Sequence, residues 1–484
     1  MAIPVGFGVL ALILLLSALV AGVVERAPIS FPILFLAIGV ALGPLGAGLV
    51  PADVHSPLLE VVGTLTLSLI LFLDGINLET AEKRHDLVVP LLTLGPGTLL
   101  VGAITAFASY FLLHLSVPLS ILAGAILAST DPVVLRDVLR DSRIPTPVRR
   151  ALSLESGAND VVVLPIILVV LAIVTHRVGG AADWSVFLVK LLVVGPALGA
   201  LIGGAGAWLM AEVDERVPIR REYQSIYGIG LVLGAYAAGV TVGVDGFLAA
   251  FAAGLAVTLF NQRLCDCFLE FGQVTAEISM LLSFVLFGAL LSDLVVGPYL
   301  WPSLALAAIV IFIARPTAML AVLTRSRTLS GPARGLIAWF GPRGLNCLLF
   351  ALLLVNAGVP QSTQLMAVIG TVVLVSVVLH GASATPIANA YARLLARRTL
   401  GEERESGVTA AFSPDEPEVV RIDVEEAARR LEGSHPPLVV DVRTRSEYAR
   451  ELEQIPGSIR VLPDHVGEWL RTAPKEKELV FYCS

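Results

Sequence analysis

The sequence predicts an all-α polytopic membrane protein of about 13 transmembrane helices, with inverted repeats, two broken helices and a small C-terminal α/β domain. Three observations predict this class. Of the 484 residues, 56% are hydrophobic and only 15% are charged, whereas roughly a quarter of a soluble domain is charged. Apolar runs of bilayer length recur along the chain. The net charge of −7 lies entirely after residue 400, because that part of the chain contains 18 acidic and only 11 basic residues.

Thirteen apolar runs approach the roughly 20 residues that a helix needs to cross a bilayer. The first has no preceding Lys or Arg and is longer than a signal-peptide core, so we interpret it as an uncleaved span. In order, the runs are 5–24, 29–46, 58–76, 87–113, 119–138, 150–175, 184–210, 222–241, 244–260, 271–291, 299–322, 334–355 and 364–391.

The charges of the loops agree with an odd number of spans. Alternate loops carry 18 Lys and Arg residues, whereas the intervening loops carry only Arg177. Because cytoplasmic loops are enriched in basic residues, this alternation predicts an N-terminus outside and a C-terminus in the cytoplasm. We therefore expect a multi-pass protein of the cell membrane, surrounded by lipid. Nothing in the charge pattern indicates a nucleic-acid partner.

Two spans are interrupted at corresponding positions. Span 5 is interrupted at Thr130-Asp131-Pro132, and span 12 at Gly341-Pro342-Arg343-Gly344. Proline cannot continue a helix normally. The offset of seven spans is odd, so equivalent spans point in opposite directions, and spans 1–6 and 8–13 form two inverted repeats joined by span 7. Paired interruptions are typical of secondary transporters, whose broken helices form the ion site.

Asp160 is the first candidate for the carrier of ions and protons. It lies within span 6 at membrane depth, where a carboxylate costs at least ~2.5 kcal/mol. Burial disfavours its charged form, so the group holds either a proton or a small cation, and this competition alone produces exchange. Asn159 beside it is neutral, so only one charge needs compensation here.

Asp131 is the second candidate, because it lies directly at the break of span 5. It can be a direct cation ligand, with Thr130 supplying a hydroxyl or carbonyl oxygen. Ser156 and Asp160 can complete the shell of oxygens that a hard monovalent cation prefers. The alternative role for Asp131 is an N-cap of the second half-helix, which suits an Asp before Pro. Both roles can coexist, and no organic cofactor is expected.

Glu155 and Arg343 are two more ionisable residues in apolar surroundings, and each needs a partner. Arg343 lies at the break of span 12, so we pair it with Glu155 as a structural salt bridge between the crossed breaks. Asp74, near the cytoplasmic end of span 3, is interpreted as a structural residue or a funnel charge. Structural roles are also favoured for Glu277 and Arg315.

Five motifs together resemble the monovalent cation/proton antiporters of the NhaP type, over roughly residues 5–395. They are Phe72 to Leu78, Ser129 to Pro132, Glu155 to Asp160, Gly246 to Gly254 and Gly341 to Gly344. The resemblance implies a homodimer in which a core domain moves against a dimer domain. Its Asn-Asp pair implies electroneutral exchange, with Glu155 paired to Arg343. The ion-binding residues that it implies are Asp160, Asp131, Thr130 and Ser156.

The C-terminal part of the chain reads as a linker and a soluble domain. Residues 1–396 form the predicted membrane domain, and the charged, Gly/Ser/Pro-containing residues 397–416 read as a linker. Beyond them, helices are expected at 423–431 and 466–470 and strands at 438–442 and 479–482. This alternation predicts a parallel α/β sheet.

Residues 417–484 are similar to a rhodanese-like domain. The similarity rests on Val440 to Arg443, Glu447-Tyr448, Ile455 to Ser458 and Phe481 to Ser484. Cys483 stands at the position of the nucleophile, whose thiolate depends on a following loop and helix N-terminus. That loop is absent from the sequence, and Gln454 stands where the family usually has His. We therefore expect a truncated domain without sulfurtransferase activity.

The leading hypothesis is a secondary antiporter, not an enzyme, that exchanges sodium or lithium for protons. A potassium/proton antiporter uses the same mechanism and stays open, because cavity size decides the ion. A membrane-anchored sulfurtransferase or sensor is the alternative from another class, but an anchor needs one span and no intramembrane carboxylates. The sequence has no G-x-x-x-x-G-K-[ST] loop and no T-V-G-Y-G-type filter, which disfavours ATP-driven transport and a potassium channel.

Overall fold

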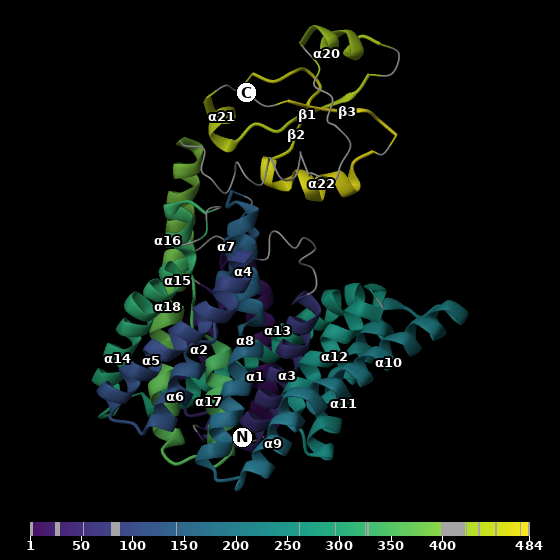
Figure 1. Ribbon diagram of the computed structural model, residues 1–484. Coiled ribbons are helices and arrows are strands. Elements are labelled where there is room, and N and C mark those ends of the chain that lie inside the picture. Colours follow the sequence, from purple (N-terminus) through teal and green to yellow (C-terminus); the bar gives the residue numbers. More distant parts are fainter. Residues whose placement is uncertain are drawn as a thin grey trace.

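The computed structural model consists of a helical bundle with a small domain of parallel sheet at one end (Figure 1). Its N-terminus lies near the opposite end of the bundle. The structure describes residues 3–24, 30–51, 53–78, 88–141, 143–260, 262–295, 297–324, 326, 329–397, 422, 424–433, 436–450, 453–474 and 476–482.

The bundle confirms the predicted polytopic helical fold. Within the described residues, eight helical stretches are long and apolar enough to cross a membrane, and five shorter apolar helices complete the 13 predicted spans. The unbroken helices are α1 (Ile3–Val24), α2 (Phe31–Leu42), α3 (Pro57–Leu78), α8 (Thr146–Val174), α11 (Arg221–Val242), α12 (Gly246–Phe260), α13 (Gln262–Leu294) and α18 (Ser362–Arg397).

Two spans are broken where the sequence predicts it. Span 5 consists of α6 (Val117–Ile126) and α7 (Pro132–Arg140), and span 12 consists of α16 (Gly331–Trp339) and α17 (Leu345–Asn356). The breaks lie against each other, since the backbone N–H of Asp131 donates to the carbonyl oxygen of Pro342 at 2.9 Å. Each break therefore brings unpaired backbone groups into the middle of the bundle.

Three further spans contain a π-helical turn beside a proline, a local irregularity that proline commonly causes. Span 4 is α4 (Val88–Leu92), η2 (Thr93–Gly97) and α5 (Thr98–Leu113), and span 11 is α14 (Leu300–Ile309), η4 (Val310–Ala314) and α15 (Arg315–Leu323). Span 7 is α9 (Ala181–Val189), η3 (Lys190–Val194) and α10 (Gly195–Arg216). Spans 4 and 11 are again seven apart, so they provide a second pair of matching irregularities.

Small residues bring the helices around α12 close together. The carbonyl oxygen of Phe72 lies where a Cβ on Gly254 would stand, and that of Ala253 lies where a Cβ on Gly203 would stand. Small residues drive helix association in a bilayer, because backbones can then approach and pack closely. The alanine- and glycine-rich α12 therefore packs directly on α3 and α10.

The C-terminal domain confirms the predicted α/β pattern. Its three parallel strands run in the order β2-β1-β3, with Val440 opposite Ile459 and Phe481. The domain contacts the bundle through a hydrogen bond between Nη2 of Arg149 in α8 and Nε2 of His465 in η5, at 2.7 Å. Residues 398–421 and Cys483 lie outside the described residues, so the linker and the nucleophile position stay predictions. The elements are α20 (Val424–Leu431), β1 (Leu438–Asp441), α21 (Arg445–Arg450), β2 (Ile459–Arg460), η5 (Pro463–His465), α22 (Val466–Thr472) and β3 (Leu479–Tyr482).

Candidate ion-binding site

Asp160 lies in α8 beside the crossed breaks and is only 1% exposed. Its Oδ1 accepts a hydrogen bond from the Ser129 hydroxyl, and its Oδ2 accepts one from the side-chain amide of Asn346, both at 2.6 Å. In the part of the chain that the structure describes, no Lys, Arg or His forms an ion pair with it. Its negative charge is therefore left for a proton or a cation to neutralise.

Asp131 caps two helices with one carboxylate. Its Oδ1 accepts from the N–H of Val133 at 2.8 Å, at the start of α7, and its Oδ2 accepts from the N–H of Leu345 at 2.9 Å, at the start of α17. The positive ends of both helix dipoles stabilise the anion. The N-cap role is thus present. Each carboxylate oxygen keeps a second lone pair, so a ligand role is compatible with it.

The expected pairing of Glu155 with Arg343 is wrong. Both oxygens of Glu155 instead accept from the guanidinium of Arg315, at 2.9 and 2.7 Å, and both side chains are almost fully buried. This bidentate geometry is the strong form of a carboxylate–arginine pair. The sequence could not show it, because Arg315 comes from span 11, which folding brings against span 6.

Arg343 has a different role at the crossing. Its Nη1 donates to the carbonyl oxygens of Ala128 at 2.7 Å and of Ser129 at 3.0 Å. These carbonyls follow the last turn of α6, where no helical N–H reaches them and the helix dipole is negative. Arg343 therefore caps the C-terminal end of α6, and Asp131 caps the N-terminal end of α17. The break of span 12 thus supplies a positive charge to span 5, and the break of span 5 supplies a negative charge to span 12.

Two glycines make room for this arrangement. A Cβ on Gly344 would overlap the carboxylate of Asp131, and a Cβ on Gly341 would overlap the guanidinium of Arg315. The G-P-R-G sequence thus lets two buried charged side chains reach the break of span 12. Close backbone approach is a use of glycine that other residues cannot serve.

The polar residues beside Asp160 form a short network. The hydroxyl of Thr130 accepts from Nδ2 of Asn159 at 2.5 Å and donates to Glu155 at 3.3 Å. Ser156 donates weakly to the carbonyl of Ser153, at 3.4 Å, and remains in its own helix turn. The Oδ1 of Asn159 is buried and accepts no hydrogen bond from any described residue. A buried oxygen without a donor is suited to a cation or a water.

Sequence reasoning missed three residues of this site. Ser129 and Asn346 bond Asp160 directly, and their positions within S-T-D-P and two residues after G-P-R-G were the available signals. Asp74 of α3 was taken for a structural or funnel charge. Its Oδ1 lies about 3.8 Å from where a Cβ on Gly157 would stand, one turn before Asp160, and its carboxyl group lies within electrostatic reach of Asp160 and Asp131. The three carboxyl groups therefore form one cluster.

A bundle with crossed broken helices around unpaired carboxylates defines the class of secondary cation transporters. Comparison with known proteins agrees. Residues 11–390 match the family described as "Sodium/hydrogen exchanger, transmembrane", and residues 423–484 match the rhodanese-like domain. This chain belongs to the sodium/hydrogen exchanger family and carries a rhodanese-like domain, which confirms both resemblances.

Relatives differ in the cation that their names give. The chain is 29% identical over 421 residues to the K(+)/H(+) antiporter NhaP of Alkalimonas amylolytica, covering 85% of this chain and 71% of that one. It is 29% identical to the K(+)/H(+) antiporter NhaP2 of Shewanella sp. strain ANA-3, covering 78% and 65%. The chain thus spans about two thirds of the length of these relatives.

A solved structure shows the same architecture. The sodium proton antiporter MjNhaP1 from Methanocaldococcus jannaschii at pH 8 superposes with a TM-score of 0.63 at 25% identity, over 79% of this chain and 100% of that one. The names of these proteins share cation/proton antiport, and they disagree on sodium or potassium.

Proposed function

We propose that this chain is a secondary active antiporter that exchanges sodium or lithium for protons by competition at Asp160. The observation that carries the proposal is that Asp160 is buried, is held only by neutral groups and has no ion-pair partner among the described residues. Glu155, five residues earlier on the same helix, is by contrast neutralised by Arg315. A buried carboxylate without a cationic partner, such as Asp160, is stabilised when it binds a proton or a cation.

The exchange is proposed to be electroneutral. Asp160 holds one proton or one monovalent cation, and its neighbour Asn159 has no charge. Glu155 stays paired to Arg315 in both states, and Asp131 is held by two helix N-termini. One positive charge therefore moves in each direction.

Oxygen atoms around Asp160 are proposed to ligate the cation. Hard monovalent ions favour carboxylate, hydroxyl and carbonyl oxygens. Asp131, Thr130 and Ser156 stay in the proposed ligand set, and the free Oδ1 of Asn159 adds a neutral oxygen to it. Asp74 adds a third carboxyl group near this centre.

Transport by the purified chain in proteoliposomes with an internal pH dye tests the proposal. We expect sodium and lithium to drive proton movement, choline to be inactive, and Asp160→Asn to abolish the response. Collapsing the membrane potential with thiocyanate should leave the rate unchanged. Exchange at the wild-type rate in Asp160→Asn would contradict the mechanism. If potassium alone drives exchange, as the names of the relatives suggest, the competition mechanism stands and the sodium assignment fails.

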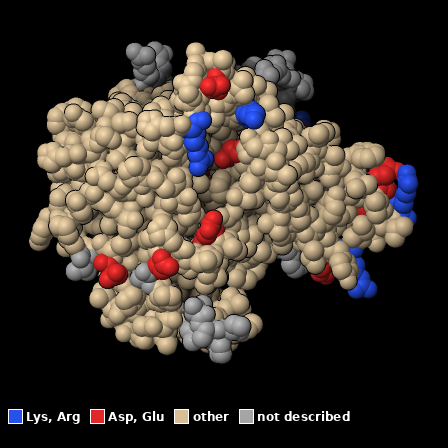
Figure 2. Space-filling model, turned by 90° about the horizontal axis from the view of Figure 1, so that it is seen from below, with Lys and Arg blue, Asp and Glu red and all other residues tan. Residues whose placement is uncertain are grey.

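The chain is further proposed to form a homodimer with its C-terminus in the cytoplasm. The helix α7, which contains two arginines, lies on the side of the bundle that carries the rhodanese-like domain (Figure 1), and Arg149 contacts His465 of that domain. The opposite face has few charges (Figure 2), which supports the orientation. Labelling of Gly179→Cys by an impermeant maleimide from outside, in a chain without its native cysteines, tests the orientation. Cross-linking in native membranes tests the dimer.

A further inference from the structure

A cavity of about 330 Å³ lies at the end of the bundle opposite the rhodanese-like domain. Three segments line it: the end of α8 with the loop that follows it, the α9–η3 segment, and the turn between α11 and α12. Figure 2 shows a hollow with basic and acidic side chains at this end. The cavity is separate from the crossed breaks, and nothing in the antiport mechanism uses it.

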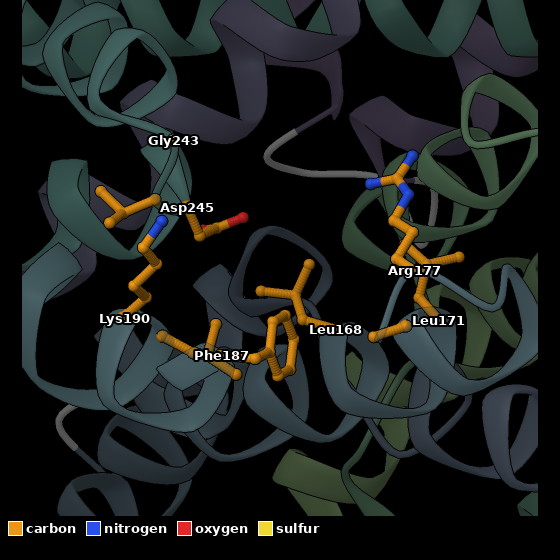
Figure 3. A pocket seen from close by; sticks show the side chains of 10 residues that line it. Leu168, Leu171, Arg177, Phe187, Lys190, Gly243 and Asp245 are labelled. Carbon is orange, nitrogen blue, oxygen red and sulfur yellow. The ribbon is translucent and has the colours of Figure 1, made fainter. Parts of the chain in front are cut away.

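The lining combines two cations with an apolar floor. Arg177 and Lys190 extend from different sides, and Leu168, Leu171 and Phe187 lie between them (Figure 3). Both basic side chains are exposed, and among the described residues neither forms an ion pair or a hydrogen bond through its side chain. Elsewhere in the bundle, exposed or half-exposed arginines such as Arg136, Arg143 and Arg216 do have carboxylate partners.

Asp245 also lines the cavity, but its carboxylate is partly engaged. Its Oδ1 accepts from the backbone N–H of Leu248 at 2.8 Å and so caps α12. With Arg177 and Lys190 it leaves the cavity with a net charge of +1. A ligand with one negative charge and a polar group that can donate to Asp245 matches this set.

An aromatic pair places the cavity at the depth of lipid headgroups. Trp184 packs edge-on against Phe187 with ring centroids 5.6 Å apart, one turn before Lys190. Tryptophan is enriched where a membrane helix meets the headgroup layer, and basic side chains extend to the same level. The polar half of the cavity then faces the headgroups, and its leucines face the acyl chains.

We propose that this cavity binds an anionic membrane phospholipid with a phosphodiester headgroup, for which phosphatidylglycerol is the probe. The phosphate contacts Arg177 and Lys190, a headgroup hydroxyl donates to Asp245, and an acyl chain covers Leu168, Leu171 and Phe187. Because α8 carries Asp160 while Lys190 and Asp245 belong to spans 7 and 9, the lipid joins the helix of the ion site to its neighbours.

The test is lipid retention by the full chain, measured by native mass spectrometry after extraction from nanodiscs. The nanodiscs contain phosphatidylcholine alone or with an equal part of phosphatidylglycerol. The variants are Arg177→Gln with Lys190→Gln, which removes both cations, and Leu168→Trp, which fills the floor and keeps the charges. Arg140→Gln with Arg220→Gln is the matched control, because both arginines are exposed and lie outside the cavity.

We expect the wild type and the control pair to retain phosphatidylglycerol in preference to phosphatidylcholine. The cavity double variant should bind it about thirtyfold more weakly, which corresponds to about 2 kcal/mol for the two basic residues together near an anionic surface. Leu168→Trp should also lose retention. Equal loss in the control pair would show a bulk charge effect and overturn the proposal. Thermal stabilisation by inorganic phosphate alone, equal to that by the lipid, would show a simple anion site and overturn it too.

Discussion

At the scale of single residues, the site is organised by which charges are paired and which are not. Glu155 and Asp160 are both almost fully buried on α8, yet among the described residues only Glu155 has a cationic partner. A permanently paired carboxylate is structural, whereas an unpaired one needs a mobile positive charge. The division of roles follows from the position of Arg315, which the linear sequence does not show.

A double-mutant cycle tests the pairing. Removing one partner of a buried pair typically costs about 3–5 kcal/mol, because the other charge stays buried alone. We expect Arg315→Gln to lower the thermal midpoint of the purified protein strongly, and Glu155→Gln with Arg315→Gln to recover much of the loss. The same cycle with Arg343→Gln in place of Arg315→Gln should give a clearly weaker coupling to Glu155, because these two side chains form no ion pair in the part of the chain that the structure describes. Strong coupling of Glu155 to Arg343 instead would contradict the site described above.

Sequence reasoning placed three residues at the crossed breaks but did not identify their partners. Asp160, Asp131 and Thr130 lie together there, as predicted, since a carboxylate or a helix break at membrane depth is visible in a linear pattern. Ser129, Asn346 and Arg315 act across helices, through contacts between residues 31, 186 and 160 positions apart. Such contacts depend on how the breaks cross, and periodicity does not encode this.

At the scale of elements, the two broken spans stabilise each other. Asp131 at the break of span 5 caps α17, and Arg343 at the break of span 12 caps α6. The half-helix ends thus have charged partners in a region without bulk water, where unpaired backbone groups are costly. The breaks were predictable from proline and glycine, but the exchange of caps between them was not.

Gly344→Ala tests the crossing. A Cβ at this position would overlap the carboxylate of Asp131, so Asp131 must move and α17 loses its cap. We expect exchange activity to fall at least tenfold because the geometry of the site is lost. A tenfold loss corresponds to a free-energy change of about 1.4 kcal/mol. Gly335→Ala in α16 is the control, since a Cβ there meets no atom within 4 Å. A fully active Gly344→Ala variant with unchanged stability would show that the close approach is not needed.

In the C-terminal domain, β1 ends at a buried ion pair. Burial alone would raise the pKa of Asp441, but side-chain and backbone hydrogen bonds from Arg443 hold it below its ordinary value. A lowered folded-state pKa contributes stability above the unfolded pKa, which is lost as the pH falls through the folded value. We therefore expect Asp441→Asn to destabilise this domain at neutral pH.

Hydrogen exchange of the strand peptides in the full chain, corrected for intrinsic rates, measures this effect. Protection of β1 and β3 should be lower in Asp441→Asn than in the wild type at pH 7. The difference should shrink as the pH falls through the lowered pKa of the folded state, because the carboxyl group is then neutral in the folded and the unfolded chain. Glu432→Gln, at an exposed position after α20, is the control and should behave as the wild type. A difference that grows on acidification would reverse the sign and contradict the assignment.

At the scale of the whole molecule, a count of spans and a count of charges were enough to predict the architecture. The breaks of spans 5 and 12 and the π-helical turns of spans 4 and 11 recur seven spans apart, as an inverted repeat requires. The short α21 and β2 of the rhodanese-like domain were missed, because elements of six and two residues have too little periodicity to detect. The contact between Arg149 and His465 joins the two parts.

Cation-induced proton release from the purified protein tests the central claim most directly. Sodium, lithium or potassium chloride is added in turn to the protein in weakly buffered solution at neutral pH, with a pH dye as the readout. We predict release of up to about one proton per chain, because cation and proton compete for one carboxylate. Asp160→Asn should release none, and Asp293→Asn, at an exposed position near the end of α13, should match the wild type. Undiminished release from Asp160→Asn, or no release from the wild type with any of the three cations, would contradict the account.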